Sequence, residues 1–245
     1  MTAPLRVEVS PKRVRALLAG HVVADSLEPL LVWETSSYPV YYFPRADVRA
    51  ELVATGAVRG IAGVGDGVVN DVTIAANTAP GGAVTFPHAP DAVAGAVRFD
   101  WDAMDEWLEE DEPVYTHPRD PYKRIDILAS SRRVVVGLDG VTVAESRRPR
   151  ILFETHLPPR YYLPLTDARL DLLHPSARHT HCAYKGEASY WSVDTGVRVH
   201  RDVVWMYRAP LPEAQKIAGL LCFYNERCDL SVDGVTQTRP RTKFS

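Results

Sequence analysis

The residues best suited to chemistry gather in one stretch of the second half of the chain. From His179 to Gly186 the sequence is HTHCAYKG, which brings a thiol, a phenol, an ammonium group and two imidazoles close together. Cys182 is the most reactive of these groups if Lys185 or His181 lowers its pKa, because the thiolate is the nucleophile. The competing interpretation is a small buried hydrophobic residue, since free cysteine is among the most buried residue types.

Lys185 follows Tyr184 and precedes a glycine. Its ammonium group can bind an anion, act as a base when desolvated, or form a Schiff base with a carbonyl compound. An exposed lysine beside a glycine turn is the ordinary alternative. We take Cys182, Tyr184 and Lys185 as the candidate catalytic residues.

Other residues around this stretch are suited to holding a ligand. The Arg160 guanidinium can bind a carboxylate or phosphate through two hydrogen bonds, or pair with Glu154 inside the fold. Trp205 and Tyr207 can wall a pocket for an aromatic or cationic ligand, although buried aromatic residues more often belong to a core. The candidate ligand-binding residues are Glu154, Arg160, Tyr162, Thr180, Trp205 and Tyr207.

Histidine and cysteine are also metal ligands, and the candidates considered for this role are His179, His181, Cys182 and His200. Alternation along a strand sends His181 and Cys182 to opposite faces. The chain has no Cys-x-x-Cys pair. We therefore predict no metal site, and the sequence indicates no cofactor.

An internal repeat identifies the elements that carry these residues. Residues 13–49 align without a gap on residues 133–169, at a constant offset of 120. Pairs that match in this register include Gly20 and Gly140, Glu34 and Glu154, Tyr41 and Tyr161, Tyr42 and Tyr162, and Asp47 and Asp167. Farther along, Phe99 matches Phe223 at an offset of 124. The repeat predicts two copies of one unit in tandem.

The two copies differ where the chemistry is expected. The first copy has the glycine- and valine-rich stretch GAVRGIAGVGDGVVNDV where the second has the polar SARHTHCAYKGEASYWSV. Arg160 aligns with Val40, so it is specific to the second copy, whereas Glu154 recurs as Glu34 and is favoured as structural. The candidate site therefore belongs to the second copy.

Alternation and turn residues predict mostly β structure. Asp139 and Gly140 favour the positive φ angles of a tight hairpin turn. The predicted elements are hairpins over Val134–Val143 and Arg15–Val23, strands over Leu30–Glu34 and Ile151–Glu154, and a helical turn or two within Asp167–Leu173 and Pro212–Ile217.

Composition divides the chain into residues 1–115, a linker at 116–128 that is dense in proline and charge, and residues 129–245. The acidic stretch Asp100–Glu112 belongs to the first copy, and most such runs are solvated. Within it Trp101, Met104 and Trp107 are expected to pack against the second copy.

Bulk properties exclude several classes of protein. The net charge of -3 and the pI near 6.2 provide no basic surface for nucleic acid. No apolar stretch approaches the roughly 20 residues that a membrane span requires, and residues 1–12 do not resemble a secretory signal. Three cysteines leave at least one unpaired, which favours a reducing compartment. We expect a cytoplasmic protein; its oligomeric state is not predicted.

The second copy carries the Glu154-Thr155 pair, the Arg160-Tyr161-Tyr162-x-Pro164 strand, Asp167, Thr180-x-Cys182-x-Tyr184-Lys185-Gly186, Trp205-x-Tyr207, and Phe223 to Asp229. In these motifs it resembles a known bacterial family, catalogued as domain of unknown function 427. The segment His117–Arg124 is similar to the linker of two-copy members. Ala183 stands where the family motif usually has proline, and the first copy lacks the Cys-x-Tyr-Lys motif.

The resemblance implies a small all-β fold of the β-tent type, similar to methionine sulfoxide reductase B and to the ligand-binding domain of cereblon. Those folds include enzymes and binding proteins, so fold alone selects no function. Our leading hypothesis is a small-molecule enzyme or ligand-binding protein with its site in the second copy. The alternative is a non-catalytic module that binds another protein, which predicts an exposed apolar patch.

Overall fold

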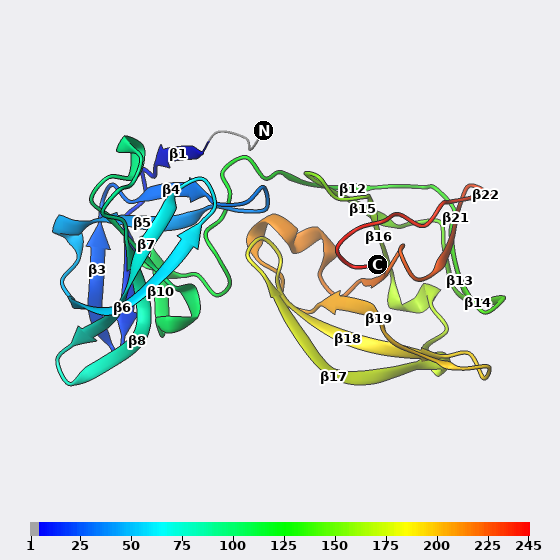
Figure 1. Ribbon diagram of the computed structural model, residues 1–245. Helices are drawn as coiled ribbons and strands as arrows, with labels where there is room; N and C mark the ends of the chain where they lie inside the picture. The colour runs from blue at the N-terminus through cyan, green and yellow to red at the C-terminus, as the bar shows by residue number, and fades with distance from the viewer. Residues whose placement is uncertain (1–4) are drawn as a thin grey trace. The chain divides into compact units, whose positions relative to one another are not determined.

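The computed structural model describes residues 5–245, which form two compact units that divide between Asp120 and Pro121. Each unit has one seven-stranded and one four-stranded antiparallel sheet (Figure 1). The predicted mostly-β class with two repeated antiparallel units is confirmed. The finer likeness to the β-tent remains a prediction.

The two units repeat one strand order. In the first unit the large sheet runs β1 (Arg6–Val9), β4 (Leu30–Trp33), β5 (Val40–Pro44), β9 (Ala96–Phe99), β8 (Asn77–Thr85), β7 (Gly65–Ile74) and β6 (Glu51–Ile61). Its small sheet runs β11 (Glu112–Pro113), β10 (Glu106–Glu109), β2 (Val14–Leu18) and β3 (His21–Ser26).

The second unit places corresponding strands at corresponding positions. Its large sheet runs β12 (Ile125–Ala129), β15 (Arg150–Glu154), β16 (Arg160–Leu163), β20 (Leu221–Phe223), β19 (Val199–Tyr207), β18 (Gly186–Asp194) and β17 (Leu173–Cys182). Its small sheet runs β14 (Val141–Ser146), β13 (Val134–Leu138), β21 (Asp229–Val232) and β22 (Val235–Thr236). The stretches that differ most in sequence thus form the same hairpin, β6–β7 or β17–β18.

Helical structure in residues 5–245 is limited to 3-10 turns: η1 (Arg45–Asp47), η2 (Asp91–Val93), η3 (Trp101–Ala103), η4 (Leu165–Asp167), η5 (Leu170–Leu172) and η6 (Pro212–Ile217). The predicted helical turn over Pro212–Ile217 is confirmed, with proline at its start. None of these turns has the length or the apolar run that crossing a bilayer requires.

The predicted hairpin turns have the expected backbone. Asp139 and Gly140 join β13 to β14 with φ angles of 50° and 77°. Ala19 and Gly20 join β2 to β3 with the same two angles. Two successive positive φ angles match the twist of the strands they connect, which is why Asp-Gly is favoured there.

Strand alternation gives each large sheet two covered faces. On β16, Tyr161 and Leu163 face the core shared with the small sheet, whereas Tyr162 faces the opposite side. The first unit repeats this arrangement with Tyr41 and Tyr42. The predicted site residues Tyr162, Trp205 and Tyr207 therefore lie on the second face of the large sheet, opposite the core that it shares with the small sheet.

Three aromatic and sulfur residues of the first unit lie elsewhere than predicted. Met104 and Trp107 are buried in the core of the first unit, and Trp101 packs against that core. The rings of Trp101 and Trp107 stack with their centroids 4.6 Å apart. The expectation that they pack against the second copy was wrong, because η3 and β10 turn these side chains inward beneath their own small sheet.

Candidate functional site

Most of the predicted site residues share the second face of the large sheet in the second unit, which we call the candidate face. Its side chains come from β15 to β20 in alternating positions. The buried members include Leu152, Tyr162, Ala188, Tyr190, Trp205, Tyr207, Cys222 and Tyr224, and Cys182 packs against them. Glu154, Arg160 and Thr180 lie at positions of the same alternation.

One end of the candidate face carries a buried ion pair. The Lys185 ammonium lies 2.5 Å from a carboxylate oxygen of Glu154, and the two side chains are 10% and 7% exposed. A second cation, Lys123, lies 3.5 Å from the other oxygen of Glu154. Lys185 is thus not the exposed lysine of the ordinary interpretation. Two ammonium groups therefore lie beside one carboxylate at this end.

A second buried pair joins Arg160 to Glu226, and we call its surroundings, at the start of β16, the Arg160 end of the face. Two parallel hydrogen bonds of 2.7 Å join the guanidinium to the carboxylate. The pKa of Glu226 lies below its usual value. Burial by itself would raise this pKa, but the hydrogen bonds from Arg160 and Thr242 to the carboxylate lower it by more. Arg160 therefore pairs with Glu226 and not with Glu154, the partner suggested by the sequence.

Aromatic rings lie around the Arg160 end. The Trp205 indole donates a hydrogen bond of 3.2 Å to the Tyr162 hydroxyl and lies 4.6 Å from the Tyr224 ring. The Arg160 guanidinium lies 5.6 Å from the centroid of Trp205. Burial raises the pKa of Tyr162 and of Tyr207 well above the usual value, so both phenols are neutral donors or acceptors.

Polar groups with partial exposure lie at the β17–β18 hairpin. The Thr180 and Tyr190 hydroxyls are 2.8 Å apart, and both Thr180 and Cys182 are partly exposed. Tyr184 is buried in the turn between the strands, with the Lys123 ammonium 5.6 Å from its ring centroid. The three candidate catalytic residues are thus near one another in the turn, at the Lys185 end of the face.

The first unit builds the same face from different residues. Arg98 lies where the second unit has Cys222, since each pairs with the matching tyrosine of the adjacent strand. Arg98 donates a 2.7 Å hydrogen bond to Glu34, the counterpart of Glu154. Trp205 and Tyr207 are replaced by Val84 and Phe86. The repeated glutamate thus takes its cation from β9 in one unit and from a turn in the other.

The first unit's version of the face is closely packed. A Cβ atom added to Gly67 would lie 2.3 Å from a methyl group of Val84 and 2.7 Å from the Phe86 ring. The corresponding residue of the second unit is Ala188, opposite Tyr207. The face of the first unit is therefore filled by apolar side chains and by the Arg98–Glu34 pair.

Sequence reasoning missed four members of the candidate face: Tyr190, Cys222, Tyr224 and Glu226. The signal was present for two of them. At the offset of 124, Cys222 aligns with Arg98 and Tyr224 with Asp100, so both positions change character between copies. Burial raises the pKa of Cys222, which makes this thiol unreactive.

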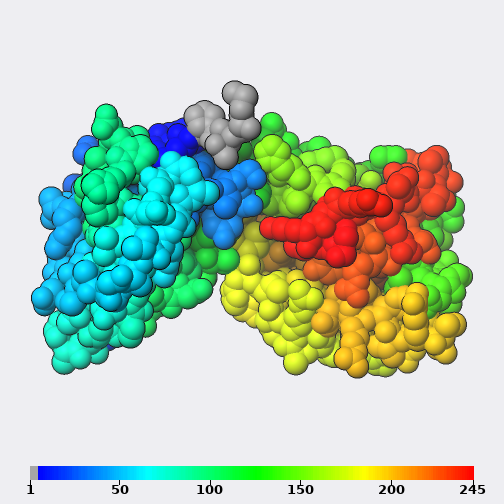
Figure 2. Space-filling model, viewed as in Figure 1, coloured from blue at the N-terminus to red at the C-terminus, as the bar shows by residue number. Residues whose placement is uncertain are grey.

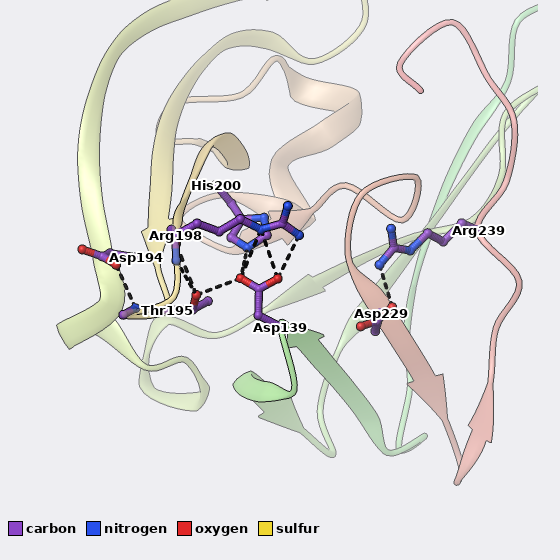
Figure 3. Close-up of polar contacts among 8 residues, drawn as sticks. Asp139, Asp194, Thr195, Arg198, His200, Asp229 and Arg239 are labelled. Carbon is purple, nitrogen blue, oxygen red and sulfur yellow. Dashed lines mark hydrogen bonds and ion pairs between the residues drawn. The ribbon is translucent and has the colours of Figure 1, made fainter.

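The histidines lie apart from the candidate face. His179 and His181 lie beside Glu187 on the β17–β18 hairpin, whereas His200 lies 2.6 Å from Asp139. Figure 3 shows Asp139 surrounded by His200, Arg198 and Thr195. This cluster links the β13–β14 turn to the β18–β19 hairpin. Within residues 5–245 no three histidine, cysteine or acidic side chains are placed to hold a metal ion.

Comparison with known families agrees with the repeat. A family model described as Domain of unknown function (DUF427) matches residues 6–110 and 126–234. The chain belongs to this family. The two matched segments lie one in each unit, so this member of the domain of unknown function 427 family carries the family fold twice. A comparison with curated proteins finds no match.

The Lys185–Glu154 pair of this family member leads to a prediction on stability. Lys185→Met removes the nearer cation from a buried carboxylate, and we expect a loss of about 2 kcal/mol or more in unfolding free energy. Lys185→Met combined with Glu154→Gln should recover much of that loss, because no buried charge is left unpaired. Urea unfolding of the unaltered chain, Lys185→Met, Glu154→Gln and the double variant measures the coupling energy between the two side chains. If the loss of unfolding free energy in the double variant equals the sum of the two single losses, the pair is not coupled and the prediction is wrong.

The Asp139 cluster predicts a dependence on pH. Hydrogen bonds from Arg198 and His200 hold the pKa of Asp139 well below its usual value of 3.8. A lowered carboxyl pKa contributes its full stabilisation above the usual value, and this contribution falls progressively as the pH drops below 3.8 toward the lowered pKa. Asp139→Asn should therefore lower the Tm at pH 7, and the difference should shrink between about pH 5 and about pH 3. A constant difference across this range would rule out the charged form as the cause.

Proposed function

We propose that the candidate face of the second unit is a small-molecule site, used for binding or for chemistry on the bound molecule. The observation that supports it is the contrast between two copies of one scaffold. Positions filled by Val84, Phe86 and Arg98 in the first unit carry Trp205, Tyr207 and Cys222 in the second. Because the same strands support both faces, this scaffold accepts either set of side chains.

The charges favour an anionic group on the ligand. Lys123 and Lys185 both lie near Glu154, so one positive charge at this end is not balanced by that carboxylate. A carboxylate or phosphate would find it a favourable neighbour, with Thr180 and Tyr190 supplying hydroxyl groups. The rings of Trp205 and Tyr207 favour an aromatic or otherwise flat ligand.

The enzymatic form of the proposal uses the three candidate catalytic residues. Cys182 would be the nucleophile, Lys185 would hold or polarise the substrate, and Tyr184 would shape the turn that carries both. Cys182 alone among the three cysteines has partial exposure. The binding form needs only the charged ends and the aromatic rings.

Under this proposal the protein acts in the cytoplasm of a bacterium and does not bind nucleic acid. All three cysteines are free thiols, which is typical of a reducing compartment. The net charge of -3 gives no basic surface of the kind that a phosphate backbone requires.

The proposal is tested by native mass spectrometry of the purified, unaltered chain, followed by denaturation and identification of any released molecule. We expect a bound small molecule that is lost in Lys185→Met and in Thr180→Val, each confirmed as folded by circular dichroism. Lys216→Met is the matched control, because Lys216 is an exposed lysine of η6 that donates a hydrogen bond to the backbone carbonyl of Ile127. An empty chain, or one that retains a polypeptide instead, would contradict the proposal.

Thiol labelling separates the enzymatic form from the binding form. In the folded protein a maleimide should modify Cys182 alone, because burial raises the pKa of Cys222 and holds that of Cys228 at about 12. An activated thiolate should react faster at pH 7 than a cysteine in an unfolded peptide of the same sequence. Peptide mapping gives the site, and a slower rate than the peptide would exclude Cys182 as the nucleophile.

A further inference from the structure

The segment Gln237–Ser245, which follows β22 and which we call the strap, lies beyond the family-matched residues. It continues the β21–β22 hairpin by running antiparallel to residues 224–230. The backbone N–H of Gln237 donates a 2.7 Å hydrogen bond to the Leu230 carbonyl. The Arg239 guanidinium lies 2.7 Å from the Asp229 carboxylate (Figure 3). In Figure 2 this red segment lies as a narrow band on the surface of the second unit.

The far part of the strap reaches the Arg160 end of the candidate face. The Thr242 hydroxyl donates a 2.5 Å hydrogen bond to Glu226, on the oxygen that also accepts from Arg160. The Phe244 ring lies 6.1 Å from the Tyr224 ring and 5.6 Å from the Arg160 guanidinium. A hydroxyl donor and an aromatic ring are thus held against the buried ion pair.

These attachments are weak compared with the rest of the unit. Every residue of the strap is exposed or only partly buried, and Phe244 is 36% exposed. The Arg239–Asp229 pair has side chains that are 50% and 59% exposed, and such surface pairs contribute little. The strap can therefore leave the face without opening a strand of the large sheet.

We propose that the strap is an internal competitor for the Arg160 end of the site, and that the ligand shares its chemistry. The ligand would place an aromatic ring where Phe244 lies and a hydroxyl or amino donor where Thr242 bonds Glu226. Its anionic group would extend toward Lys185. This inference rests on the proposed function, and it narrows the ligand to aromatic acids that carry a hydrogen-bond donor.

The test measures binding of 4-hydroxyphenylacetate, which has a phenol donor, a ring and a carboxylate. Isothermal titration compares the unaltered chain with Thr242→Val, Phe244→Ala and the double variant. Releasing the strap should tighten binding by about fivefold, the factor that corresponds to one weak surface contact. Arg241→Gln is the matched control, because Arg241 is an exposed strap residue outside both contacts, and it should bind as the unaltered chain does.

A second readout uses the unaltered chain alone. Saturating 4-hydroxyphenylacetate should speed tryptic cleavage after Arg241, whereas a free peptide of residues 237–245 should be cleaved at one rate with or without it. The proposal that the strap competes with the ligand would be overturned by either of two results. One is an equal affinity for 4-hydroxyphenylacetate in all the variants, and the other is a rate of tryptic cleavage after Arg241 that the probe does not change. No binding even to the double variant would overturn the ligand class, while a bound molecule in the native mass spectrum would still support the proposed function.

Discussion

The structure of each unit depends on one constraint: a seven-stranded sheet must cover both of its faces. Alternation assigns one set of side chains to the core shared with the small sheet and the other set to the opposite face. The first set is similar in the two units, because it holds the sheets together. The second set is free to change, and it differs most between the units.

The repeated glutamate shows how such a change is accommodated. Glu34 and Glu154 hold equivalent positions, and each needs a cation because a buried carboxylate is costly without one. Arg98 meets this need from a strand inside the first sheet, whereas Lys185 meets it from a turn. Relocating the cation leaves the Cys222 position without charge and surrounds it with Trp205 and Tyr162. The two copies thus pair the same buried glutamate with cations from different parts of the fold.

Much of this could be predicted from the sequence, and the failures have a common cause. The repeat, the Asp139-Gly140 turn and the polar segment of the second unit follow from local patterns. The partner of Arg160 does not, because Glu226 is 66 residues away and the chain forms β17, β18, β19 and β20 between them. Trp101 and Trp107 were misassigned for the same reason, since their inward direction is set by pairing of β10 with β2.

The position of Lys185 in a turn has a consequence for the motions of the second unit. A turn opens more easily than a central strand, and opening this one would withdraw the ammonium from Glu154 while the carboxylate stays in the sheet. An anion that binds Lys185 would hold the closed turn in place. Under the proposed function, order in the hairpin and occupancy of the site would therefore be coupled thermodynamically, whereas the cation of the first unit lies on β9.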